Sequence, residues 1–219
     1  MEKYHTYFLS IHIAAGTISL VLAPIAMIVK KGGSAHRLWG KIYFWSMAVV
    51  ALTAIIMSVY HHIPFLLMVA IFSFYSAFAG YRILYRKKAV HWKELKILDK
   101  AGTVLNGLFS AALCVYGMLV WKSGETALGI ISLVFAGIGM RTAFLEFRSY
   151  FRPVHDLKGW LRAHIGGMVG SYIAAVTAFL VNTGFFLPDL VRWLGPTVIG
   201  VPLIVWFTRK YVGPKKQQA

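Results

Sequence analysis

Histidines are the residues of this chain whose type and placement best suit chemistry. The 219-residue sequence has eight of them. Neutral imidazole ligates zinc, copper and iron, including haem iron. A histidine inside an apolar membrane segment is a functional-site hypothesis by default. Half of the histidines lie near one end of the apolar segments and half near the other; these groups are His5, His12, His61 and His62, and then His36, His91, His155 and His164.

Two histidines of the second group stand in matching positions. His36 and His164 each lie about one turn inside the start of an apolar segment, and each has an arginine nearby, Arg37 and Arg162. Two imidazoles at equal depth on two helices are what a bis-histidine b-type haem needs, and arginines can pair with its propionates. We therefore predict that His36 and His164 are axial ligands of haem b.

Other chemistry is open to the same residues. A zinc site needs three or four ligands, which could come from His36, His91, His155 and His164. A zinc-dependent membrane hydrolase would then use Asp156 or Glu146 as its base. The simpler alternative is that these histidines cap helices or snorkel at the interface.

The first group predicts a second, outer cofactor site. His5 and His12 are seven residues apart, about 10 Å along one helix face, so they do not easily bind one metal together. His12 could instead pair with His61 or His62 from the next segment. The alternatives are that His12 hydrogen-bonds a neighbouring helix and that His61 and His62 occupy a solvated turn before Pro64.

Arg141 needs a partner because an unpaired arginine is costly near the hydrocarbon edge. Glu146 lies five residues further on, which is a poor helical spacing for an ion pair. We predict that Arg141, like Arg37 and Arg162, serves as a partner for an anion such as a propionate, a carboxylate or a lipid phosphate. Snorkelling to the interface is the alternative.

The elements that position these residues are apolar helices. The chain is 58% hydrophobic and 14% charged, with a mean hydropathy of +0.67, and a spanning helix needs about 20 apolar residues. We predict an all-α protein with one domain, 1–219, and seven transmembrane helices at approximately 5–29, 36–60, 64–86, 101–121, 125–147, 163–184 and 190–208.

Charge sets the predicted orientation. All Lys and Arg residues except Lys3, Lys122 and Arg192 lie on one side of the membrane in this topology. Cytoplasmic loops retain such residues, so we expect the N-terminus outside and the C-terminus inside a bacterial inner (plasma) membrane. The net charge of +16 then faces lipid headgroups, and nucleic-acid binding is not expected. The one cysteine, Cys114, excludes an intrachain disulfide and a thiolate-held iron–sulfur cluster.

Two further patterns narrow the function. None of the seven acidic residues lies at the centre of a predicted helix, which disfavours proton- or sodium-coupled transport. The spacing of Gly166 and Gly170 lets a helix approach another backbone closely. This spacing could serve helix packing within the chain, a homodimer seam, or a flat surface against a planar ligand.

The segments His36-Arg37-Leu38-Trp39-Gly40 and Trp160 to Asn182 resemble a family of bacterial predicted inner-membrane proteins of unknown function that carry a His-Arg-x-x-Gly motif. The motif is also similar to helix starts in transmembrane b-type cytochromes, which implies haem and electron transfer. We expect a membrane redox protein that moves electrons between a quinol or cytoplasmic donor and an acceptor. The alternatives are the zinc hydrolase and a non-catalytic binder or carrier of a lipid or small hydrophobic molecule.

Overall fold

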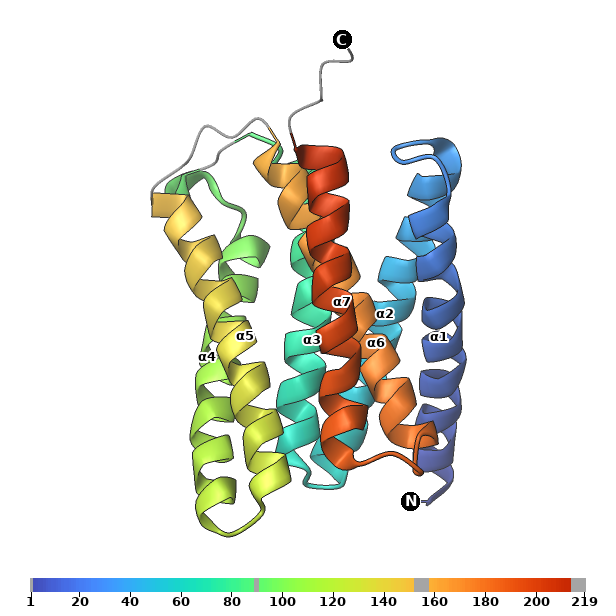
Figure 1. The fold of residues 1–219 in the computed structure, drawn as a ribbon, viewed down its shortest axis with the longest axis vertical. Coiled ribbons are helices and arrows are strands. Elements are labelled where there is room, and N and C mark those ends of the chain that lie inside the picture. Colours follow the sequence, from blue (N-terminus) through green and yellow to red (C-terminus); the bar gives the residue numbers. More distant parts are fainter. Residues whose placement is uncertain (1, 89–90, 152–157, 214–219) are drawn as a thin grey trace.

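Seven long helices make up the fold (Figure 1). The computed structural model describes residues 2–88, 91–151 and 158–213, and this part of the chain contains no strand. The long helices are α1 (Glu2–Ile28), α2 (Ser34–Tyr60), α3 (Pro64–Arg82), α4 (Ile97–Lys122), α5 (Thr126–Phe151), α6 (Gly159–Thr183) and α7 (Asp189–Val212). Two short 3₁₀ turns, η1 (Ile83–Tyr85) and η2 (Trp92–Glu94), connect α3 to α4.

All seven helices are long and apolar enough to cross a membrane. The prediction of an all-α, seven-helix membrane protein is confirmed. Five helix boundaries differ from the prediction by four residues; among them, α4 begins at Ile97 rather than 101 and α5 continues to Phe151 rather than ending at 147. The two extensions add Asp99 and Tyr150, which bond Arg82 and Arg86 as described below.

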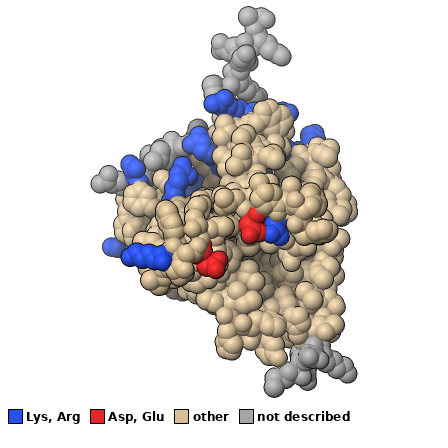
Figure 2. All heavy atoms as spheres, turned by 60° about the horizontal axis from the view of Figure 1, so that its bottom comes forward, with Lys and Arg blue, Asp and Glu red and all other residues tan. Residues whose placement is uncertain are grey.

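The helices form a four-helix core with additions on two sides. Helices α1, α2, α3 and α6 pack together, α7 packs on α6, and the α4–α5 hairpin packs on α3. The α1–α2 connection and the end of α7 lie at the top of Figure 1, and the N-terminus lies at the bottom. We call the end with Lys31, Arg37 and Lys210 the cationic end. Figure 2 turns the other end forward and shows a mostly uncharged surface, with the blue side chains mainly in the upper part of the view.

Glycines allow a close contact between two helix backbones where α3 crosses α6. A Cβ on Gly167 would lie 2.6 Å from the Cα of Gly80, and one on Gly80 would lie 2.8 Å from the backbone nitrogen of Met168. Only glycine allows two helix backbones to approach so closely. By contrast, a Cβ on Gly166 or Gly170 would meet nothing within 4 Å. The helix contact therefore uses Gly167, and the Gly166–Gly170 pair faces open space.

Candidate functional site

His36 and His164 lie face to edge between α2 and α6, near the cationic end. Their ring centroids are 6.2 Å apart and their planes are 77° apart. The Nδ1 atom of His36 donates to the carbonyl oxygen of Ala26 on α1 at 2.9 Å. The Nδ1 atom of His164 donates to the carbonyl oxygen of Gly80 on α3 at 2.8 Å. Four helices therefore fix one pair of imidazoles.

These anchors determine which ring nitrogen is available. A carbonyl oxygen only accepts, so Nδ1 carries the proton in both rings, and in the neutral ring the lone pair is on Nε2. Histidines that bind metals are usually held in this way, with the second nitrogen donating to a backbone carbonyl or a carboxylate. His36 and His164 therefore have the tautomer and the anchoring of ligands.

The separation of the two rings matches one mode of coordination. Two imidazoles on opposite sides of one metal, each with a metal–nitrogen bond of about 2 Å, have centroids roughly 6.3 Å apart. Adjacent coordination positions would bring the centroids to roughly 4.5–5 Å. The 6.2 Å between the centroids of His36 and His164 is close to the opposite-side distance; coordination would further require the two Nε2 atoms to point toward each other.

Open space lies beside α2 one turn from His36, and on a face of α6 that points away from His164. Gly40 is one turn from His36 on α2, and Gly166 and Gly170 follow His164 on α6. An added Cβ would meet nothing within 4 Å at any of these three glycines. A flat ligand could approach the helix backbones at these positions without displacing a side chain.

The predicted anion partners have different positions. The side chain of Arg37 is exposed and has no ion pair with the described residues, and that of Arg162 is exposed as well. Arg141 is exposed on α5, and Glu146 bonds Arg86 rather than Arg141 among the described residues. Arg37 and Arg162, which neighbour the two histidines in sequence, are therefore better placed than Arg141.

Lys31 adds a fixed charge at the cationic end. Its Nζ donates to the carbonyl oxygen of Ala26 at 3.3 Å, the same oxygen that accepts from His36. It also donates to Met27 and lies 5.8 Å from the ring centroid of Phe207 on α7. Burial lowers the pKa of Lys31 from its ordinary value, and repulsion from Lys210 lowers it further.

The outer histidines are not arranged as predicted, since His12 does not contact His61 or His62 in the hydrogen bonds and ring contacts of the described residues. His12 Nδ1 contacts the carbonyl oxygen of Val50 at 3.1 Å and the Oγ1 of Thr53 at 2.9 Å. His12 therefore bonds a neighbouring helix, which was the alternative interpretation. His61 packs against His5 instead, with ring centroids 4.7 Å apart. His62 is exposed in the turn and has a φ of 55°.

The predicted zinc ligands are only partly within the described chain. His155 and Asp156 lie outside the described residues. His91 is exposed at the start of η2, where it belongs to a capping box with Glu94. Among the described residues, no group of three or more His, Cys, Asp or Glu side chains could hold a metal ion. The zinc hydrolase stays a prediction.

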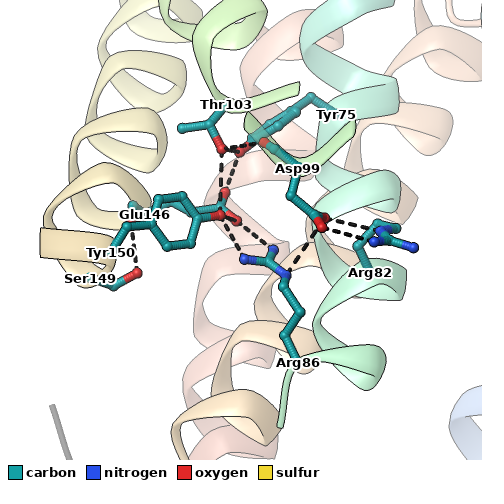
Figure 3. A network of polar contacts seen from close by, with 8 residues as sticks. All are labelled: Tyr75, Arg82, Arg86, Asp99, Thr103, Glu146, Ser149 and Tyr150. Atoms are coloured by element: carbon teal, nitrogen blue, oxygen red, sulfur yellow. Dashed lines mark hydrogen bonds and ion pairs between the residues drawn. The ribbon is translucent and has the colours of Figure 1, made fainter. Parts of the chain in front are cut away.

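A buried charge network joins α3, α4 and α5 near the cationic end (Figure 3). Arg82 donates to both carboxylate oxygens of Asp99, at 2.9 and 2.8 Å. Arg86 donates to Glu146 at 2.9 Å and to the hydroxyl of Tyr150 at 2.7 Å. The side chain of Asp99 is 1% exposed, and those of Arg82 and Arg86 are 17% and 9% exposed. Charges this deeply buried need such partners.

The network continues through hydroxyl groups. Tyr75 and Tyr150 both donate to the Glu146 carboxylate, and Tyr75 also contacts Thr103 at 3.1 Å. Sequence reasoning missed these contacts. The opposite charges of Arg82, Arg86 and Asp99, close together at helix ends, were a signal that could have indicated an ion-pair network. The network ties the α4–α5 hairpin to α3 and leaves the histidine pair in the other half of the molecule.

An apolar groove lies on the surface between α1 and α2. It is about 650 Å³ in volume, and its lining includes Ile18, Ile42 and Trp45, with Lys41 as a charged member. A hydrocarbon chain fits this lining, because nearly all of it is apolar.

Comparison of the chain with protein-family models, with curated proteins and with solved structures finds no match. The resemblance of the His-Arg-x-x-Gly segment to a family of membrane proteins stays a prediction. Function must be argued from the site itself.

Proposed function

We propose that this membrane protein is a b-type cytochrome in which His36 and His164 hold one haem. The observation that carries the proposal is the anchored pair of imidazoles, 6.2 Å apart, with both Nδ1 atoms bonded to backbone carbonyls. When bound, the haem would supply reversible one-electron transfer. Two ligands from the chain suffice for haem because the porphyrin provides the other four, whereas zinc would need more protein ligands.

The surroundings of the pair support a planar, anionic group. Gly40 provides open backbone surface one turn from His36, on the same face of α2. Arg37 and Arg162 follow and precede the two histidines at the cationic end, where they can bind carboxylates. The residues present therefore fit the cofactor in ligand type and charge.

The orientation follows from the positive-inside rule. We infer that the cationic end faces the cytoplasm of a bacterial inner membrane, with the N-terminus outside. A haem held by His36 and His164 would then lie near the inner surface, within reach of a cytoplasmic donor or a membrane quinol. A homodimer is a further possibility that the open Gly166–Gly170 surface offers.

Haem content in matched variants tests the assignment. We expect His36→Ala and His164→Ala each to lose most of the haem that purifies with the wild-type protein, because each removes one axial bond. His91→Ala is the control, since His91 is exposed on η2 and far from the pair in sequence. Haem would be measured as its pyridine complex, per mole of protein.

Unchanged haem content in both His36→Ala and His164→Ala would contradict the assignment of these ligands. Bound zinc in a haem-free wild-type protein would favour the hydrolase instead. A protein without either would favour binding of a lipid in the α1–α2 groove.

A further inference from the structure

Residues whose side chains or backbone carbonyls are positioned for hydrogen bonds recur every seven residues along the facing sides of α1 and α2. His12, Ser19 and Ala26 form such a series on α1, and His36, Tyr43 and Val50 form one on α2. Bonds fix both ends of the antiparallel pairing, since Ala26 bonds His36 and Val50 bonds His12. Seven residues are two helical turns, about 10.5 Å. Ser19 therefore lies level with Tyr43, midway between the two bonded ends.

Helix α6 contributes a residue at the level of Ser19 and Tyr43. The hydroxyl of Tyr43 lies 2.7 Å from the Oγ of Ser171, a pairing between residues 128 apart in sequence. His36 and His164 are separated by the same number, so α2 and α6 keep one register over two turns. A middle layer of three hydroxyl residues, Ser19, Tyr43 and Ser171, thus lies two turns below the histidine pair.

This middle layer is sealed from the surface yet incompletely bonded. Ser19 and Ser171 are 0% exposed and Tyr43 is 2% exposed. The Oγ of Ser19 has no hydrogen-bond partner. Tyr43 must donate to Ser171, because Ser171 donates its own proton to the carbonyl of Met168 at 2.9 Å. The lone pairs of the Tyr43 hydroxyl are therefore available to a further donor.

A second unpartnered hydroxyl lies towards the outer end. Thr177 is 3% exposed, and its Oγ1 also has no partner. In the register of α2 and α6 it is level with Val49, next to the Val50 carbonyl that His12 contacts. Buried polar atoms in native proteins are bonded to protein or to ordered water. The unpartnered hydroxyls of Ser19, in the middle layer, and of Thr177, nearer the outer end, indicate internal water between these helices.

We propose that Ser19, Tyr43, Ser171 and Thr177 hold internal water and form, with His12, a proton pathway through the α1–α2–α6 core. A proton enters at His12, and each hydroxyl or water accepts one proton as it releases another. No group is consumed, and the driving force is the membrane potential or a pH difference. The pathway leads to the histidine pair at the cationic end, but it requires no haem.

Proton entry into liposomes tests this pathway. Purified protein would be reconstituted in vesicles containing pyranine, with a potassium gradient and valinomycin to drive protons inward. We expect wild-type vesicles to take up protons faster than protein-free vesicles. Ser19→Ala should slow the uptake roughly five- to tenfold, the effect of losing about one net hydrogen bond from the barrier.

Ser110→Ala is the matched control. Ser110 is also a buried hydroxyl without a partner, 2% exposed, but it lies on α4 against Gly139 of α5. Its removal should leave the uptake unchanged. Tyr43→Phe should slow the uptake as well; because it also removes a bond between α2 and α6, Ser19→Ala is the decisive variant.

Two results would overturn the pathway. One is wild-type uptake no faster than in empty vesicles, and the other is Ser19→Ala uptake equal to that of the wild type. Neither result bears on haem, which is measured separately by its absorption. A haem protein without proton uptake would thus reject only the pathway, and a haem-free protein with uptake would reject only the cytochrome.

Discussion

Gly167→Ala should separate α3 from α6 and thereby weaken the histidine site. The added Cβ would lie 2.6 Å from the Cα of Gly80 and 2.7 Å from the carbonyl oxygen of Ser76. Both are backbone atoms, which cannot rotate away. Ordinary contact begins at 3.4 Å, so the helices must move apart by about 0.8 Å.

That movement has two consequences for stability. The bond from His164 to the Gly80 carbonyl would lengthen from 2.8 Å to roughly 3.6 Å, beyond hydrogen-bond distance. Overpacking costs about 1–3 kcal/mol and the lost bond about 1 kcal/mol, while the helix preference of alanine over glycine returns up to about 1 kcal/mol. We expect a net loss of about 1–3 kcal/mol.

The assay is unfolding in detergent, followed by helical circular dichroism as SDS is increased. Gly166→Ala is the control, because its Cβ would meet nothing within 4 Å, and it should be neutral or slightly stabilising. Haem retention should fall in Gly167→Ala, since His164 loses its anchor. Equal stability of the two variants would refute the described contact between α3 and α6.

Three other predictions concern charge, ligand space and topology. Asp99→Asn should destabilise the protein by about 3–5 kcal/mol, because it leaves a buried arginine without its ion-pair partner. The control is Asp189→Asn, which should cost less than about 1 kcal/mol because the Asp189 side chain is 58% exposed. Equal losses of stability in the two variants would contradict the buried network. Gly40→Leu should lower haem retention with little change in the SDS midpoint, because it fills open space; full retention would show that haem does not use this surface. In a cysteine-free background, Ser123→Cys should react with an impermeant maleimide in intact cells and Lys93→Cys only after lysis; the reverse would invert the topology.

The fold was predictable because hydropathy and charge act locally along the chain. Each apolar segment is long enough to span the bilayer on its own, so the number of helices needed no knowledge of their packing. The ends of α4 and α5 were less predictable. From the sequence, the charge of Asp99 predicts a loop; it can lie in a helix because Arg82, on another helix, forms an ion pair with it.

The site was predictable in part. The equal depth of His36 and His164 follows from their positions at helix starts, and the structure brings them together. Their anchors do not follow, because the carbonyl groups of Ala26 and Gly80 have no sequence signature. The partner of Glu146 was also hidden, since Arg86 reaches it from a segment sixty residues away.

Part of the middle hydroxyl layer could have been predicted from the sequence. The seven-residue spacing from His12 to Ser19 and from His36 to Tyr43 is visible in the sequence, and it places each pair on one helix face. What the sequence lacks is the register between helices, which the bonds of His12 and His36 supply.

The most direct test of the central claim is the absorption spectrum of wild-type protein, purified in mild detergent from cells supplied with haem precursor, before and after dithionite reduction. A bis-histidine haem predicts a Soret band that shifts on reduction and sharp α and β bands, with one haem per chain. A featureless visible spectrum would contradict the claim that His36 and His164 hold a haem.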